Sequence, residues 1–213
     1  MLFYHLIVLD ASGSMDCIRK NALSGCNETI QSIRSLQAKA NGEHSHFLSL
    51  ITFNSEAPLN YIYDRLPIAN AQDLQLKQYV PDGCTPLYDA LGLGMTKLHA
   101  AIDSTQETSV LVTVITDGLE NASTEFNADK IRRMVEQYKQ SGWTFAFIGA
   151  NIDEVTEAGK LGIHNSLRFD QTEAGTAEMF DCYRESVERF CCAAPNGLSP
   201  KARERGFFAK EGR

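Results

Sequence analysis

The sequence predicts a doubly wound α/β fold, because two kinds of segment alternate along its 213 residues. Short, nearly continuous apolar runs rich in β-branched and aromatic residues suit strands of a parallel sheet that is covered on both faces. Segments with apolar residues at helical spacing lie between these runs. In sheets of this kind the ligand crevice lies beyond the carboxyl ends of the strands, so functional residues are expected there.

Four apolar runs are the clearest strands, and two weaker runs add to them. The first starts almost at the N-terminus and leads directly into Asp10. Strand boundaries read from a pattern of this kind shift by a few residues. The predicted strands cover residues 2–9, 47–53, 110–115 and 144–148, and the weaker ones cover 60–63 and 166–169.

Helical periodicity is clearest in two apolar stripes, each of which is expected to face a core. A third helix fits residues 128–141, where Asn127 can cap the start and Gly142 can stop the helix. A last helix is expected near residues 174–191. The two stripes are Ile18, Ala22, Cys26, Ile30 and Ile33, and Leu87, Leu91, Met95, Leu98 and Ile102.

Length and composition favour one packed domain, which we place at residues 1–192. With 43% hydrophobic and 22% charged residues, the chain is too apolar for a disordered protein. Its net charge of −7 repels polyanions, so no nucleic acid partner is expected. No apolar run approaches the roughly 20 residues of a spanning helix, so no membrane is expected either. Residues 193–213 are interpreted as a flexible, solvated tail.

The six cysteines lack paired C-x-x-C spacing, and the chain is large enough to fold without disulfides. We therefore expect reduced thiols, and the adjacent Cys191 and Cys192 are interpreted as packing residues. The N-terminus shows no basic region and no small-residue cleavage site before the first strand. Together these features predict a cytoplasmic protein.

Three polar segments fall at the edge of the sheet where the crevice is expected. Asp10-Ala11-Ser12-Gly13-Ser14 follows the first strand, Asp82-Gly83-Cys84-Thr85-Pro86 precedes a helix, and Thr116-Asp117-Gly118 ends a strand. Each has an ordinary explanation when taken alone. Asp and Ser are common in turns and helix caps, and Thr85 can cap a helix that begins with Pro86.

Taken together, the three segments predict a metal site, because they converge on one spot at the same edge of the sheet. Two carboxylates and three hydroxyls form a hard, all-oxygen set. Such a set suits Mg²⁺, Mn²⁺ or Ca²⁺ and would hold zinc or copper poorly. The predicted metal ligands are Asp10, Ser12, Ser14, Thr85 and Asp117.

The same segments carry a specific resemblance to von Willebrand factor A domains. Residues 6–15 resemble the D-x-S-x-S signature of that family, residues 83–87 its threonine loop, and residues 115–118 its distal aspartate. Their order, spacing and strand context agree over roughly residues 1–190. Cys84 departs from the pattern, since many members have glycine before the threonine. This departure removes no ligand.

The resemblance implies a mostly parallel, six-stranded sheet between helices, with one antiparallel edge strand and a metal-ion-dependent adhesion site. It implies that Ser12, Ser14 and Thr85 supply hydroxyl oxygens to Mg²⁺, while Asp10 and Asp117 bind directly or through water. It also implies a protein partner that presents Glu or Asp to the metal. Bacterial cytoplasmic members often work beside ATPases or within stress-response clusters, so a component of such a system is an expected partner.

Other candidates have simpler explanations. His44 and His46 form an H-x-H pair before a predicted strand, but no third ligand is close in the sequence, so a loop role is favoured over a metal site. Cys84 is interpreted as an inert thiol, with reaction with oxidants as the alternative. Asp89 is expected to favour the positive end of its helix, with support of the metal as the alternative.

The predicted site favours a binding module over an enzyme, because it contains no evident base, nucleophile or phosphate-cradling glycine loop. The alternative is a Mg²⁺-dependent phosphohydrolase of the haloacid dehalogenase type, which also begins with an apolar strand ending in Asp. That chemistry needs a second acid two residues after the nucleophile, and Ser12 stands there instead. A serine hydrolase is disfavoured too, since no G-x-S-x-G elbow surrounds Ser12 or Ser14.

Overall fold

A computed structural model of the protein describes residues 1–103, 105–150, 154–193 and 206–208, which form alternating strands and helices. The strands are β1 (Leu2–Asp10), β2 (Ser45–Phe53), β3 (Asn60–Pro67), β4 (Thr108–Thr116), β5 (Thr144–Ala150) and β6 (Ser166–Phe169). The helices are α1 (Arg19–Lys39), α2 (Leu87–Ala101), α3 (Ala128–Gln140), α4 (Glu154–Lys160) and α5 (Glu173–Ala193). Short 3-10 turns are η1 (Gly13–Ile18), η2 (Ile68–Asn70) and η3 (Leu76–Gln78).

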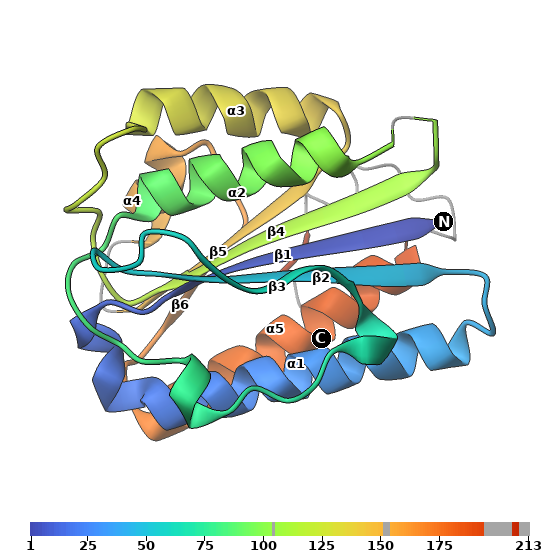
Figure 1. The fold of residues 1–213 in the computed structure, drawn as a ribbon, viewed down its shortest axis with the longest axis horizontal. Helices are drawn as coiled ribbons and strands as arrows, with labels where there is room; N and C mark the ends of the chain where they lie inside the picture. The colour runs from blue at the N-terminus through green and yellow to red at the C-terminus, as the bar shows by residue number, and fades with distance from the viewer. Residues whose placement is uncertain (104, 151–153, 194–205, 209–213) are drawn as a thin grey trace.

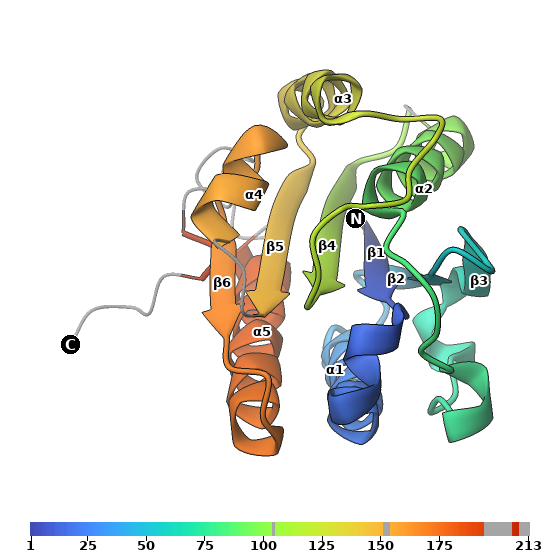
Figure 2. The ribbon, with the colours of Figure 1, turned by 90° about the vertical axis from the view of Figure 1, so that its left-hand side faces the viewer.

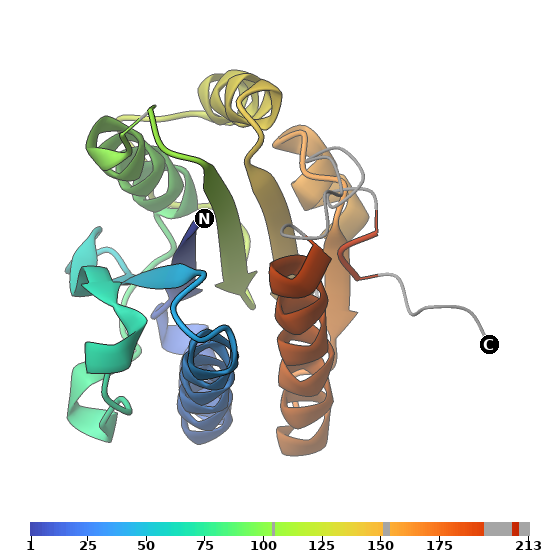
Figure 3. The same ribbon diagram turned by 90° about the vertical axis from the view of Figure 1, so that its right-hand side faces the viewer.

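The six strands form one sheet in the order β3-β2-β1-β4-β5-β6, with helices on both faces (Figure 1). Helices α2, α3 and α4 cover one face, and α1 and α5 cover the other, as Figures 2 and 3 show. All neighbouring strands are parallel except β3, which pairs antiparallel with β2 at the edge. The doubly wound, mostly parallel sheet with one antiparallel edge strand is therefore confirmed.

The register of the central strands aligns their carboxyl ends. In β1, Asp10 lies opposite Phe53 of β2, and Leu9 lies opposite Ile115 of β4. Thr116, the last residue of β4, lies opposite Gly149 of β5. The loops that follow these strands consequently start at the same edge of the sheet, as the sequence predicted.

The strands read as continuous apolar runs because both faces of the sheet are buried. In β1, Ile7 and Leu9 belong to the core under α1 and α5, while Leu6 and Val8 belong to the core under α2 and α3. Each face therefore takes alternate residues of the same strand.

Two departures from the predicted elements have local causes. The first helical stripe begins in η1, so the α-helix itself starts only at Arg19. Helix α4 was not predicted, because seven residues are too few to show a helical period.

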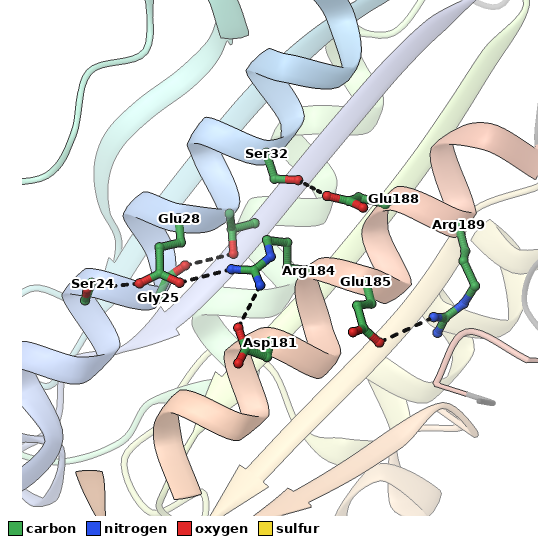
Figure 4. Close-up of polar contacts among 10 residues, drawn as sticks. Ser24, Gly25, Glu28, Ser32, Asp181, Arg184, Glu185, Glu188 and Arg189 are labelled. Carbon is green, nitrogen blue, oxygen red and sulfur yellow. Dashed lines mark hydrogen bonds and ion pairs between the residues drawn. The ribbon is translucent and has the colours of Figure 1, made fainter. Parts of the chain in front are cut away.

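Helices α1 and α5 approach closely because Gly25 has no side chain. A Cβ atom at Gly25 would lie 2.0 Å from the ring of Phe180, which is far inside contact distance. Polar contacts line the rim of this helix pair (Figure 4). Arg184 pairs with Glu28 at 3.1 Å and with Asp181 at 2.8 Å. These ion pairs are partly exposed and contribute little, so close packing dominates the pairing of the two helices.

The C-terminal tail was predicted to be flexible and solvated. Ala193 belongs to α5, and residues 194–205 and 209–213 lie outside the described residues. At residues 206–208 the chain lies against the core, where Phe207 is buried and contacts the rings of Tyr183 and Phe190. Among the described helices, none combines the length and the apolar character that crossing a membrane requires.

Candidate metal centre

Three loops meet at the carboxyl edge of the sheet, and backbone hydrogen bonds join them. After β1, the N–H of Ala11 donates to the carbonyl of Phe53 at 2.9 Å. The N–H of Gly13 donates to the carbonyl of Gly83 at 3.1 Å, and the N–H of Asp82 donates to the carbonyl of Ala11 at 2.8 Å. The loop that carries Ser12 and Ser14 is thus fixed against the loop that carries Thr85.

Asp10 ends β1 with a fully buried side chain. Its Oδ1 accepts the backbone N–H of Ser12 at 2.7 Å, and its Oδ2 accepts the hydroxyl of Thr116 at 2.5 Å. The hydroxyl of Tyr79 donates to the backbone carbonyl of Asp10 at 2.7 Å. These contacts fix the orientation of the carboxyl group at the point where the three loops meet.

Burial raises the pKa of Asp10 to about 6, and the charge of Asp117 adds to the rise, although hydrogen bonds from Thr116 and Ser12 oppose it. Among the described residues, no Lys or Arg forms an ion pair with Asp10 or Asp117. A buried carboxylate without a counter-charge is unfavourable, so this position favours a cation or a proton.

Asp117 and the two serines form the second part of the cluster. The hydroxyl of Ser14 donates to Oδ1 of Asp117 at 2.6 Å, and Oγ of Ser12 lies 3.2 Å from Oγ of Ser14. Burial also raises the pKa of Asp117, and the hydrogen bond from Ser14 opposes this rise. Contacts from Asp10 to Ser12, from Ser12 to Ser14 and from Ser14 to Asp117 therefore join four of the predicted ligands.

Gly118 shows that Thr85 belongs to the same cluster. A Cβ atom at Gly118 would lie 3.2 Å from Oγ1 of Thr85, 3.8 Å from Oγ of Ser14 and 3.9 Å from Oδ2 of Asp10. Oxygens from the segment after β1 and from the loop before α2 thus lie around one point beside Gly118, and Asp117, which precedes Gly118, joins them through Ser14. All five residues predicted as metal ligands lie in one cluster.

The capping explanations for these hydroxyls do not hold in the structure. Ser12 is the N-cap of η1, but its side chain makes no capping hydrogen bond. The N-cap of α2 is Pro86 and not Thr85, whose backbone N–H donates to Oδ1 of Asn121 at 2.8 Å. The hydroxyls of Ser12 and Thr85 remain available as ligands in the cluster.

Gln171 is a functional candidate that the sequence analysis missed. It lies in the loop between β6 and α5, and its side-chain N–H donates to Oδ2 of Asp117 and to the carbonyl of Ser14, the latter at 3.0 Å. A usable signal was present, because Gln171 follows a predicted strand whose carboxyl end lies at the same edge. This contact connects the loop before α5 to the candidate metal centre.

Asp89 supports the loop beside the centre. It lies in the first turn of α2, as expected, and its carboxylate accepts the backbone N–H groups of Thr124, Glu125 and Phe126 at 2.8–2.9 Å. It therefore organises the segment that follows Gly118. Cys84 is exposed, and its backbone N–H donates to the hydroxyl of Ser55 at 2.9 Å.

The loop role proposed for the H-x-H pair is wrong for His46. Strand β2 begins at Ser45, two residues earlier than predicted, so His46 lies within the strand and is buried. Its ring is 3.1 Å from that of His5 on β1, measured from Nδ1 to Nε2. His44 precedes the strand and is partly exposed.

Solved structures with similar folds include domains named for this architecture. A von Willebrand factor type A protein from Catenulispora acidiphila has a TM-score of 0.54 at 17% identity, over 87% of this chain and 42% of that one. The chain has a von Willebrand factor A fold. No family model matches its sequence, and no curated protein sequence matches it.

Two further solved structures with similar folds contain metals. Proximal thread matrix protein 1 from the mussel byssus, with a zinc-occupied MIDAS motif, has a TM-score of 0.57 at 14% identity, over 89% of this chain and 46% of that one. Manganese-loaded TRAP protein from Plasmodium vivax has a TM-score of 0.53 at 17% identity, over 84% of this chain and 73% of that one. The chain spans less than half of the length of the first of these and of the Catenulispora protein.

The cluster in this chain fits a hard divalent cation. Its donors are all oxygens and include two buried carboxylates that form no ion pair with any described residue, and Gly118 leaves space beside three of the oxygens. Small hard cations prefer oxygen ligands from several directions, and loops that arrive from three strands can supply them.

Proposed function

We propose that this protein is a metal-dependent protein interaction module. Asp10, Ser12, Ser14, Thr85 and Asp117 would hold one divalent cation, for which we propose Mg²⁺, with Mn²⁺ or Ca²⁺ as substitutes. The observation that carries the proposal is that oxygens of Asp10, Ser14 and Thr85 lie around the point beside Gly118, with Asp117 bound to Ser14. The bound cation would then provide the contact for a partner protein.

Charge balance supports a partner with an acidic side chain. Asp10 and Asp117 bring two negative charges, which match one divalent cation, while the hydroxyls of Ser12, Ser14 and Thr85 add none. A bound ion would supply positive charge for a carboxylate at a position that the protein leaves open. The exposed side of the cluster, where Ser14 lies, provides access for a Glu or Asp of the partner.

The similar structures support an interaction role by analogy. One is a thread matrix protein with zinc in a MIDAS motif, another is manganese-loaded TRAP, and a third is the pilus adhesin SpaC from Lactobacillus rhamnosus GG. We extend metal-dependent binding to this chain on the strength of its own oxygen cluster, and we propose that the module is not an enzyme. An ATPase or a component of a stress-response cluster is the partner class that the sequence resemblance favours.

We further propose that the protein works in a reducing compartment, the cytoplasm. All six cysteines are thiols, and Cys17, Cys84 and Cys192 are exposed. Exposed thiols persist where the environment is reducing. If the protein formed disulfides readily and still bound metal and partner fully after oxidation, the proposed cytoplasmic location would be contradicted.

Calorimetric titration of the metal-free protein with Mg²⁺ and with Mn²⁺ tests the proposal. We expect one-to-one binding in the wild type and no measurable binding in Asp10→Ala or Asp117→Ala. Asp16→Ala is the matched control, since Asp16 is an exposed carboxylate in η1, close in sequence to the cluster but outside it. Circular dichroism confirms folding. Undiminished metal binding by Asp10→Ala would overturn the assignment.

The phosphohydrolase alternative has its own test. The position two residues after Asp10 carries the hydroxyl of Ser12, which lies beside another hydroxyl, that of Ser14, at 3.2 Å. A hydroxyl there cannot serve as the general acid of that chemistry. We expect no hydrolysis of phosphate esters above background, and turnover that requires both Mg²⁺ and Asp10 would favour the enzyme.

A further inference from the structure

A second group of metal-ligating side chains lies away from the oxygen cluster. His5 on β1, His46 on β2 and Cys191 near the end of α5 each offer one ligand atom, and these atoms all lie within 4.8 Å of one another. All three side chains are buried, with 2%, 2% and 5% of their surface exposed. His5 precedes Asp10 by about 16 Å along the strand, so this group is separate from the candidate metal centre.

The spacing of the group suits a metal ion. Nε2 of His5 lies 3.1 Å from Nδ1 of His46, and the two rings are nearly parallel, with an interplanar angle of 12°. In a tetrahedral site with metal–nitrogen distances near 2.0–2.1 Å and metal–sulfur distances near 2.3 Å, ligand atoms lie roughly 3.3–3.6 Å apart. The two imidazoles are already near this separation, and Cys191 needs to approach by only about 1 Å.

The facing nitrogens of His5 and His46 lie close enough for both rings to turn a lone pair toward one metal ion. Neutral imidazole is the form that binds metals. Only one proton fits between Nε2 of His5 and Nδ1 of His46, so one of these nitrogens already has a free lone pair. The other gains one when its proton moves to the second nitrogen of the same ring.

Two ring nitrogens in this region are buried without a hydrogen-bond partner among the described residues. They are Nδ1 of His5 and Nδ1 of His44. Phe3 packs against both neighbouring histidines, stacked on His46 at 4.6 Å and edge-on to His44 at 5.7 Å. Packing alone explains the stacked rings but not the buried nitrogens, since a buried polar atom normally finds a partner.

We propose that His5, His46 and Cys191 form a second metal site and that this site holds Zn²⁺. Imidazole and thiolate are borderline and soft ligands, which favour Zn²⁺ over the hard cations that the oxygen cluster suits. Binding converts the thiol of Cys191 to a thiolate and releases its proton to solvent, while the histidines bind as neutral rings. The metal ties the end of α5 to β1 and β2.

Substitution of Co²⁺ for Zn²⁺ tests the site, because a thiolate bound to Co²⁺ gives a charge-transfer absorption that oxygen ligands do not. The full-length chain is stripped with chelator, reduced, and titrated with Co²⁺ in the presence of excess Mg²⁺. We expect the band in the wild type and equally in Asp10→Ala, followed by loss of the band when Zn²⁺ is added. Retention in Asp10→Ala separates this site from the proposed function.

Single substitutions test which side chains bind the metal ion. Cys191→Ala should lose the thiolate band, and His46→Gln should weaken Co²⁺ binding by at least tenfold while circular dichroism stays native. Cys192→Ser is the matched control, because it changes the adjacent, exposed thiol and should keep the band. Absence of the band from the wild type overturns the proposal, and so does an unchanged band in Cys191→Ala.

Discussion

Two regions of the molecule, the carboxyl edge of the sheet and the buried face under α1 and α5, hold their polar side chains in different ways. At the carboxyl edge, oxygen donors come from loops after β1, before α2 and after β4, and Ser14 among them is exposed. On the α1 and α5 face, His5, His46 and Cys191 come from within strands and a helix, and all are buried. Loops permit exchange of a ligand with a partner, whereas regular elements hold a closed set. The first region therefore suits recognition and the second suits structural support.

The largest expected effect separates the two regions by their metals. Asp10→Asn removes one of the two charges of the oxygen cluster but keeps its shape, so Mg²⁺ affinity should fall by at least about 100-fold, or roughly 2.7 kcal/mol. Zinc binding at the histidine group should stay within twofold. Calorimetric titration with each ion measures both effects. Equal losses for Mg²⁺ and Zn²⁺ would mean that the two regions are not independent.

A core substitution tests the comparison by disturbing α5, which carries Cys191 and follows the loop that contacts the oxygen cluster. Gly25→Ala places a Cβ atom within 2.0 Å of the Phe180 ring and forces α1 and α5 apart. We expect the free energy of unfolding to fall by about 1–3 kcal/mol, as for other overpacked cores. Chemical denaturation measures the loss, and Gly159→Ala, where an added Cβ atom meets nothing within 4 Å, is the control.

In Gly25→Ala the free energy of Mg²⁺ binding should change less than the free energy of unfolding, because the proposed metal ligands lie in loops. A tenfold loss of Mg²⁺ affinity in a folded Gly25→Ala protein would contradict the independence of the oxygen cluster from α5 packing.

In the metal-free protein, the two regions should make opposite contributions to the pH dependence of the free energy of unfolding. Burial lowers the pKa of His5 to about 3 and of His46 to about 4 from an ordinary 6.5, so these groups take up protons on unfolding, and stability rises from about pH 3 to 6.5. Burial raises the pKa of Asp10 from 3.8 to about 6, so its contribution falls as pH rises through that interval.

Asp10→Asn removes only the falling contribution. We expect a steeper rise of stability between pH 4 and 6, by up to about 1.4 kcal/mol per pH unit, because one proton fewer is released on unfolding. Urea denaturation across this range measures the slope. A shallower slope in Asp10→Asn would show that the sign assigned to Asp10 is wrong.

The smallest expected effect concerns the contact between the loop before α5 and the oxygen cluster. Gln171 donates to Asp117 and to the carbonyl of Ser14, so its amide competes with a cation for one carboxylate oxygen. Gln171→Ala should raise Mg²⁺ affinity by about two- to fivefold, the order of one modest hydrogen bond. Gln75→Ala, in the turn η3, is the control. A loss of Mg²⁺ affinity in Gln171→Ala would instead make Gln171 a supporting residue.

The sequence predicted the carboxyl edge well because parallel strands end at the same edge. The six strands and the convergence of Asp10, Thr85 and Asp117 follow from apolar runs and the polar residues next to them. Gln171 was missed although the same argument applied to it, since it stands two residues beyond β6. The pattern that predicted the site consisted of carboxylates and hydroxyls, and the amide of Gln171 fell outside it.

The histidine group could not be predicted from local patterns. The H-x-H pair was visible, but its partners lie 41 residues before His46, at His5, and near the other end of the chain, at Cys191. No spacing rule brings them together. Their contact depends on the pairing of β1 with β2 and on the path of α5 across the sheet, which are long-range features of the fold.

Crystals of the protein soaked in Mn²⁺ would test the central claim most directly, because Mn²⁺ gives an anomalous signal that locates the ion. The account predicts one strong peak among Asp10, Ser12, Ser14, Thr85 and Asp117, beside Gly118, and no such peak in crystals of Asp117→Ala. A well-ordered wild-type crystal without a peak at this cluster, or with its main peak elsewhere on the chain, would contradict it.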